Sequence, residues 1–172
     1  MSHREWILVV ESDPRVAESI RWSLTETGLR VVIVSDGLAA LEAFFDDPPP
    51  TLVTLELNVP SVSGFRLIEL FKRHSPKIPV LVVTSLEFEE ATDAIRAGAD
   101  DFVTKPINAG TFVKRVLDLL PVASEAGSFD FRFNRPAATE YAAAESSTAH
   151  QLTPAIREKA GLAVSAGAKY LA

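Results

Sequence analysis

The sequence predicts an α/β fold, a doubly wound sheet of five parallel strands followed by an extended linker and a helix. Three observations predict the sheet. Apolar runs of strand length alternate five times with stretches of helical periodicity before residue 120, and such alternation indicates a parallel sheet with helices on both faces. The strand-like runs are almost continuously apolar, as expected of strands buried on both faces. The helical stretches begin after capping residues and end at glycine or proline.

The expected strands are short and rich in aliphatic residues, which is typical of buried parallel strands. WILVV and RVVIV are the first two, PVLVVT is the fourth and DFVT is the last. In chain order the strands are expected at residues 6–10, 30–34, 51–55, 79–84 and 101–104.

The first helix is expected to start after Asp13, which is suited to the N-cap position, with Pro14 as its first residue and Gly28 as its end. Asp36 can cap the second helix, and the DDPPP segment stops it because proline cannot continue a helix. In chain order the helices are expected at residues 14–27, 38–45, 65–74, 87–97 and 108–120.

Polar residues follow the ends of the expected strands. In sheets of this kind, functional groups collect in the crevice at the carboxyl ends of the strands. Glu56 is the most conspicuous of them, since it ends an apolar run and is followed by the turn residues Pro60 and Gly64. The crevice residues are Glu11, Ser12, Asp13, Glu56, Thr84, Ser85 and Lys105.

Composition excludes several classes of protein. The net charge is -6, all of it within residues 1–120, and neither part of the chain has the basic excess of a nucleic-acid-binding module. No apolar run is long enough to span a membrane, and cysteine is absent, which fits a cytoplasmic protein. No Gly-rich phosphate loop or nucleophile elbow is present. We therefore expect no catalytic site, no nucleic-acid partner and no membrane partner.

The character of the chain changes after residue 120. Residues 121–152 are rich in Ala, Ser, Thr and Glu and are interpreted as a linker, and residues 153–172 are expected to form a C-terminal helix. Within the linker, SFDFRFN (residues 128–134) would place three phenylalanines on one face if extended. This segment is a docking motif for a partner, a strand that packs on the chain's own domain, or plain linker. The expected partner-binding residues are Phe129, Phe131, Phe133, Ile156, Val164 and Tyr170.

Four motifs in order carry a family resemblance: ILVVESDP, LELNVPSVSG, PVLVVTS and AGADDFVTKP. Together they resemble the receiver domain of two-component response regulators. The resemblance covers residues 5–120, about two thirds of the chain. It implies a flavodoxin-like receiver fold, a domain at residues 1–120 and a role in signal transduction.

The resemblance also implies roles for individual residues. It places Glu56 at the phosphoacceptor position, where the family has aspartate, and places Glu11 and Ser12 at the two positions that help hold magnesium. Thr84, Phe102 and Lys105 fall at the switch and signalling positions. Pro106 follows the lysine and fixes its loop, a place where a cis peptide bond can occur.

Two of these positions depart from the family pattern. Glu56 is one methylene longer than aspartate, so its carboxylate is displaced by about 1.5 Å, and a misplacement of about 1 Å can reduce a rate on the order of a hundredfold. Ser12 offers magnesium a neutral hydroxyl instead of a carboxylate. We expect no cofactor and no resident metal. Weak magnesium binding is the residual alternative, with Glu11, Asp13 and Glu56 as candidate ligands.

The longer side chain suggests a positive role. Glu56 can pair with Lys105, accept a hydrogen bond from Thr84 and bias Thr84 and Phe102 toward an active-like arrangement. Two plainer interpretations stay open. In one, Glu56 is a solvated loop acid. In the other, its pair with Lys105 only holds the loops together.

The preferred interpretation is an atypical receiver, or pseudo-receiver, that acts as a phosphorylation-independent adaptor. Its partners would be proteins such as a histidine kinase or another signalling or assembly protein. The resemblance implies a partner surface between Glu87 and Leu120, which also allows a homodimer. One alternative is a phosphorylatable response regulator that uses Glu56 or Asp13 with magnesium. Another is a structural assembly subunit that oligomerises through its C-terminal tail.

Overall fold

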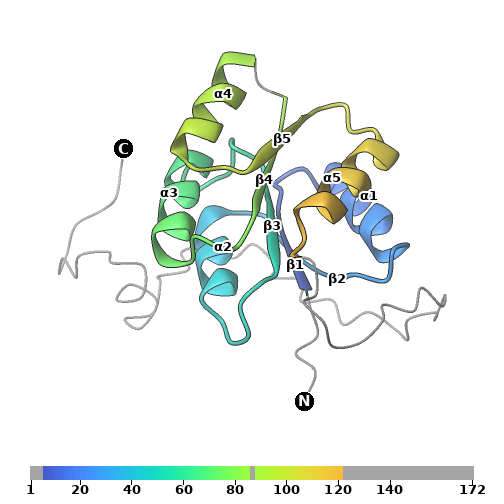
Figure 1. The fold of residues 1–172 in the computed structure, drawn as a ribbon, viewed down its shortest axis with the longest axis horizontal. Coiled ribbons are helices and arrows are strands. Elements are labelled where there is room, and N and C mark those ends of the chain that lie inside the picture. The colour runs from blue at the N-terminus through green and yellow to red at the C-terminus, as the bar shows by residue number, and fades with distance from the viewer. Residues whose placement is uncertain (1–5, 86–87, 122–172) are drawn as a thin grey trace.

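The sheet has the five parallel strands that the sequence predicts. The computed structural model describes residues 6–85 and 88–121. Within them the strands follow the order β2-β1-β3-β4-β5, and every neighbouring pair is parallel (Figure 1). The strands are β1 (Trp6–Val10), β2 (Arg30–Val34), β3 (Leu52–Leu55), β4 (Val80–Thr84) and β5 (Asp101–Thr104).

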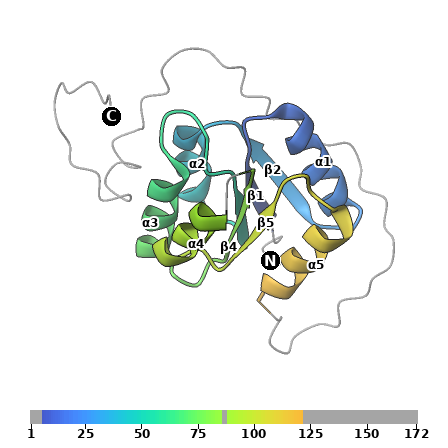
Figure 2. The ribbon, with the colours of Figure 1, turned by 90° about the horizontal axis from the view of Figure 1, so that it is seen from above.

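Helices cover both faces of the sheet, as the doubly wound class requires. They are α1 (Pro14–Thr25), α2 (Gly37–Phe44), α3 (Gly64–His74), α4 (Phe88–Ala97) and α5 (Ala109–Leu119). Seen from above, α1 and α5 lie on one face and α2, α3 and α4 on the other (Figure 2). None of the helices in these described ranges is both long and apolar enough to cross a membrane.

Two apolar cores flank the sheet because side chains alternate along each strand. In β1, Leu8 and Val10 belong to the core under α2, α3 and α4. Ile7 and Val9 belong to the core under α1 and α5. The three interior strands β1, β3 and β4 are buried along their whole length, which explains why their sequences are almost entirely apolar without alternation.

The predicted boundaries are correct to within one or two residues. Asp13 and Asp36 are N-caps, as predicted: Asp13 accepts the backbone N–H of Arg15, and Asp36 accepts those of Leu38 and Ala39. The first helix ends at Thr25, two residues earlier than predicted. The last helix starts one residue later than predicted, because Asn108 is its N-cap, with the side chain accepting a hydrogen bond from the Thr111 N–H.

Candidate functional site

Three charged side chains meet at the carboxyl end of the sheet. Glu11 follows β1, Glu56 follows β3 and Lys105 follows β5. Because β1 and β3 are neighbours, with Val10 beside Leu55, the two glutamates leave the sheet side by side. Both backbones are fixed there: the N–H of Glu56 donates to the Val10 carbonyl at 2.9 Å and that of Glu11 to the Val34 carbonyl at 3.0 Å.

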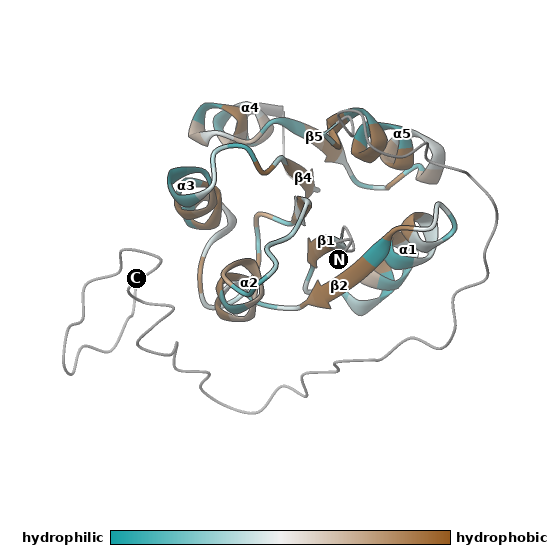
Figure 3. Cartoon of the chain, turned by 60° about the horizontal axis from the view of Figure 1, so that its bottom comes forward, coloured by the Kyte–Doolittle hydropathy of each residue, from teal (hydrophilic) through white to brown (hydrophobic). Residues whose placement is uncertain are grey.

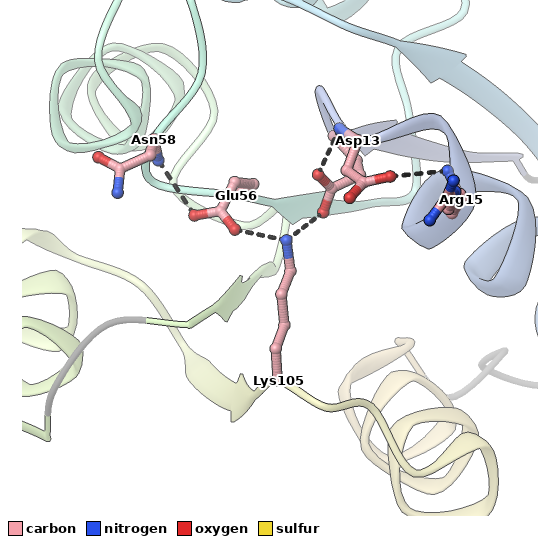
Figure 4. Close-up of polar contacts among 6 residues, drawn as sticks. Asp13, Arg15, Glu56, Asn58 and Lys105 are labelled. Carbon is pink, nitrogen blue, oxygen red and sulfur yellow. Dashed lines mark hydrogen bonds and ion pairs between the residues drawn. The ribbon is translucent and has the colours of Figure 1, made fainter.

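Lys105 bridges the two glutamates, and Figure 4 shows its contact with Glu56. Its Nζ lies 2.6 Å from Oε2 of Glu56 and 2.7 Å from Oε2 of Glu11. The side chains of Glu11 and Glu56 are only 2% and 6% exposed, and that of Lys105 is 18% exposed. The predicted pair of Glu56 with Lys105 is therefore present, and Glu56 is not a solvated loop acid. The second ion pair of Lys105, with Glu11, was not predicted.

The remaining oxygen of each glutamate binds the chain just beyond it. Oε1 of Glu56 accepts a hydrogen bond from the Asn58 N–H at 3.0 Å. In the same way Oε1 of Glu11 accepts from the Asp13 N–H at 2.9 Å. Each carboxylate thus has a backbone donor on one oxygen and the lysine on the other. We call Glu11, Glu56 and Lys105 the acid–lysine cluster; it holds two carboxylates for one ammonium group.

The other two residues of the predicted acidic pocket lie outside this cluster. Asp13 is exposed, and its Oδ1 accepts a hydrogen bond from the Arg15 N–H at 2.8 Å, as an N-cap of α1 does. Figure 4 shows this carboxylate directed toward Arg15, away from Glu56. Ser12 is exposed as well. Capping therefore already explains Asp13, which makes it a poor substitute for Glu56 as an acceptor.

A glycine positions the loop that carries Glu56. A Cβ atom on Gly64 would lie 2.5 Å from Leu57 Cα and 3.0 Å from the Glu56 carbonyl oxygen, so only glycine fits this approach without a shift of the backbone. The Gly64 N–H also donates to the Leu57 carbonyl at 2.9 Å. The start of α3 is thereby packed directly on the residues that orient Glu56.

The residues at the predicted switch positions lie on the two adjoining strands. Thr84 is fully buried at the end of β4, and its carbonyl accepts the Lys105 N–H at 2.9 Å. Phe102 lies in β5 beside Val82 and packs, partly buried, against the core under α2, α3 and α4. The peptide bond between Lys105 and Pro106 is cis, as the sequence suggested. The hydrogen bond from Thr84 to Glu56 stays a prediction.

The cluster keeps the lysine charged. Burial of the ammonium group lowers the pKa of Lys105, but the hydrogen bonds and opposite charges of Glu11 and Glu56 outweigh this effect. The net result is a pKa raised above the ordinary 10.5. Lys105 is therefore a cation throughout the physiological range of pH.

The donor set does not fit a magnesium ion. Magnesium demands near-octahedral oxygen ligands, usually with one or two carboxylates among them. The carboxylates of Glu11 and Glu56 already share the Lys105 ammonium group, and Ser12 supplies no charge. Across residues 6–85 and 88–121, no three Asp, Glu, His or Cys side chains are grouped so that they could hold a metal.

The signal that Glu11 belongs to the cluster was available in principle. Glu11 and Glu56 each stand directly after a strand, and the expected topology makes those strands neighbours. The backbone donor at Asn58 carries no side-chain signature, so sequence reasoning could not find it. Six predicted partner-binding residues lie outside the described residues: Phe129, Phe131, Phe133, Ile156, Val164 and Tyr170.

Comparisons with known proteins agree with this architecture. The family model of the response regulator receiver domain matches residues 7–117. The response regulator MprA of Mycobacterium ulcerans is 35% identical over 115 residues, which cover 66% of this chain and 49% of that protein. The alkaline phosphatase synthesis transcriptional regulatory protein SphR of Synechococcus elongatus is 32% identical over 123 residues, which cover 66% and 48%. The chain spans about half the length of these curated relatives.

Solved structures give the same picture. The receiver domain of NtrX from Brucella abortus matches with a TM-score of 0.63 and 29% identity, covering 66% of this chain and 97% of that one. The BeF3-activated DrrB receiver domain matches with a TM-score of 0.61 and 29% identity, covering 67% of this chain and 97% of that one.

Proposed function

Because this chain belongs to the response regulator receiver domain family, we propose that it is an atypical receiver that signals through protein–protein contacts without phosphorylation of residue 56. In this proposal Glu56 replaces part of what a phosphoryl group would do. The glutamate carboxylate binds the lysine at the position where the family resemblance expects a phosphoryl contact.

The observation that carries the proposal is that both oxygens of the buried Glu56 carboxylate are already engaged. One oxygen contacts Lys105 at 2.6 Å and the other accepts the Asn58 N–H at 3.0 Å, while the side chain is 6% exposed. A phosphoryl group added to Glu56 would have to displace the lysine or the backbone donor. In-line attack on a phosphodonor also needs an accessible carboxylate and a divalent metal ion to spread the charge. Here the Glu56 carboxylate is paired with Lys105, and the donor set does not fit magnesium.

The proposed output is a surface contact. The proposed partner surface is formed by residues 87–120. Residues 121–172 are proposed to be the output segment, which acts by contacts and not by DNA binding. A protein partner, such as a histidine kinase or another signalling or assembly protein, is proposed over nucleic acid because residues 121–172 hold five acidic and five basic side chains. A homodimer through residues 87–120 is compatible with the same proposal.

Incubation of the full chain with acetyl phosphate and magnesium, followed by intact mass measurement, tests the proposal. We expect no gain of a phosphoryl group by the unmodified chain. The matched variant Ser12→Asp with Glu56→Asp restores both family residues and should gain one, because the shorter carboxylate and the second acid restore the metal and acceptor geometry. Each single variant should gain less than the pair. A stable phosphoryl adduct on the unmodified chain would instead establish a phosphorylatable regulator.

A further inference from the structure

The two edges of the sheet differ in character. At one edge, strand β2 begins with the charged residue Arg30. The four residues that follow, Val31, Val32, Ile33 and Val34, are apolar and partly exposed. At the other edge, β5 begins with Asp101 and ends with the exposed Thr104. Edge strands carry unpaired backbone groups and are usually protected by charge, by proline or by a covering segment. Figure 3 shows β2 as an almost entirely hydrophobic strand at the border of the sheet.

Within the described residues, β2 pairs only with β1, so its outer side has no strand partner there. Val32 and Val34 pack toward the core under α2, and Val31 and Ile33 toward the core under α1. A strand added along the outer side of β2 would therefore place alternate side chains beside the core under α2 and beside the core under α1.

A groove lies beside β2 on the α2 side. It is lined by Trp6, Arg30, Val32, Ala43 and the segment from Asp46 to Pro48. One wall is fixed, because the Trp6 indole N–H donates to the Pro48 carbonyl at 3.0 Å. Side chains that alternate along an added strand would enter this groove from one of its faces. Pockets for alternate side chains beside an open edge are how sheets bind extended peptides.

We propose that residues 129–133 of this chain bind there as a sixth strand, parallel to β2. The five residues FDFRF match the five residues of β2 in length. Phe129, Phe131 and Phe133 then lie on the α2 side, in and above the groove, while Asp130 and Arg132 lie on the α1 side. The alternating phenylalanines thus cover the apolar edge that β2 leaves open.

The connection is long enough. Helix α5 ends at Leu119 and packs beside α1, which itself packs on β2. The axes of packed helices such as α5 and α1 lie about 8–10 Å apart. From the α1 axis to the outer side of β2 is about 10 Å more, roughly two strand spacings. Residues 121–127 can span about 23–25 Å when extended, which exceeds this total of about 20 Å.

The handedness of the connection selects β2 over β5. Parallel strands are joined by right-handed crossovers in nearly all proteins. The unit β1–α1–β2 moves toward the β2 edge with its helix on the α1 face. A connection from β5 through α5, on the same face, to a strand outside β2 moves in the same direction and has the same hand. A parallel strand outside β5 would require the opposite hand.

Crosslinking tests the placement, and the absence of cysteine from the chain makes it clean. In the proposed register Asp130 lies beside Val31, and neighbouring strands are about 4.8 Å apart. The pair Val31→Cys with Asp130→Cys should react with a short bis-maleimide within one molecule, roughly tenfold faster than Thr104→Cys with Asp130→Cys, which probes β5. Equal rates would overturn the proposal. Crosslinks mainly between molecules would overturn it in favour of a second copy as the occupant.

Hydrogen exchange provides a test without cysteines in the domain. The outward amide hydrogens of β2 should exchange at least about tenfold more slowly in the unmodified full chain than in a variant with Phe129, Phe131 and Phe133 changed to Ser. This variant alters no residue of either core, so it keeps the fold. Identical exchange of β2 in both chains would overturn the proposal.

Discussion

Two lysines make close ion pairs at opposite ends of the same sheet. At the carboxyl end, Lys105 lies 2.6 Å and 2.7 Å from two glutamate oxygens whose side chains are 6% and 2% exposed. At the other end, Lys72 lies 2.6 Å from Oδ2 of Asp100, whose side chain is 36% exposed. The two ammonium groups are almost equally buried, at 18% and 15% exposure. The two lysines therefore differ in the burial and the number of the acids that they contact, not in their own burial.

The Lys72 pair is balanced in charge and tied to the backbone. Its Nζ also donates to the Ile78 carbonyl at 2.9 Å, and Oδ2 of Asp100 also accepts the Val80 N–H at 2.7 Å. These contacts join the end of α3 to the starts of β4 and β5. The pair is a structural tie.

The acid–lysine cluster is unbalanced. Two buried carboxylates share one cation, so the cluster keeps a net negative charge in a poorly solvated place. Removing charges from water is expensive, and a buried ion pair is weak support for stability. The comparison indicates that the acid–lysine cluster serves the function of the site, whereas the Lys72 pair stabilises the fold.

Removing each lysine gives the largest expected contrast. Lys105→Met should lower the free energy of unfolding by about 3–5 kcal/mol at pH 7, because two buried carboxylates lose their cation. Lys72→Met should lower it by about 1–3 kcal/mol, because Asp100 stays partly solvated and keeps its backbone donor. Urea denaturation of the two full-length variants measures both. Equal losses would show that charge balance does not separate the two ends.

The fold was predictable because it depends on patterns within single segments. The apolar run at residues 6–10, the proline at the start of α1 and the cap at Asp36 each act locally, and the structure confirms them. The error at the end of α1 arises because its last turn tightens: the Thr27 N–H donates to the Leu24 carbonyl and the Gly28 N–H to the Thr25 carbonyl, three residues back instead of four, so the helix ends at Thr25 although Gly28 ends the turn.

Contacts of the site were predictable only for residues such as Glu56 and Lys105, which directly follow a strand at a position that the family resemblance assigns. The pair of Glu56 with Lys105 follows from the resemblance, and the structure contains it. The tie between Lys72 and Asp100 joins residues 28 positions apart through the geometry of two loops. Nothing in either local sequence indicates that contact. Long charged side chains reach several partners, and only the packed structure selects one.

The pH dependence of stability sharpens the comparison at the Lys105 end. The pKa of Lys105 is raised above 10.5 in the folded chain by Glu11 and Glu56. Its contribution to stability is therefore fully present below pH 10.5, the unfolded value, and is lost as the pH rises through the folded pKa. The difference in unfolding free energy between the unmodified chain and Lys105→Met should shrink only above pH 10.5. Urea denaturation from pH 8 to about 12 measures it. A difference that already falls between pH 8 and 10 would contradict the raised pKa.

Neutralising one acid at each end gives the smallest expected effect and the sharpest test of balance. Glu56→Gln leaves Lys105 with Glu11, a balanced pair. The single amide oxygen of the glutamine can accept either the Asn58 N–H or a proton of the Lys105 ammonium group. The free energy of unfolding should change by less than about 1 kcal/mol. Within residues 6–85 and 88–121, Asp100 is the only acid that forms an ion pair with Lys72. Asp100→Asn removes this acid and should lower the free energy of unfolding by about 1–2 kcal/mol.

Chemical denaturation of both variants at pH 7 decides between two roles of Glu56. If Glu56→Gln costs more than Asp100→Asn, the Glu56 carboxylate holds the loops together, and its charge is a structural feature like that of Asp100. If Glu56→Gln is the milder change, the second carboxylate is retained despite contributing little to stability. Because the fold does not need that charge, its position facing Lys105 then belongs to signalling, as the proposed function requires.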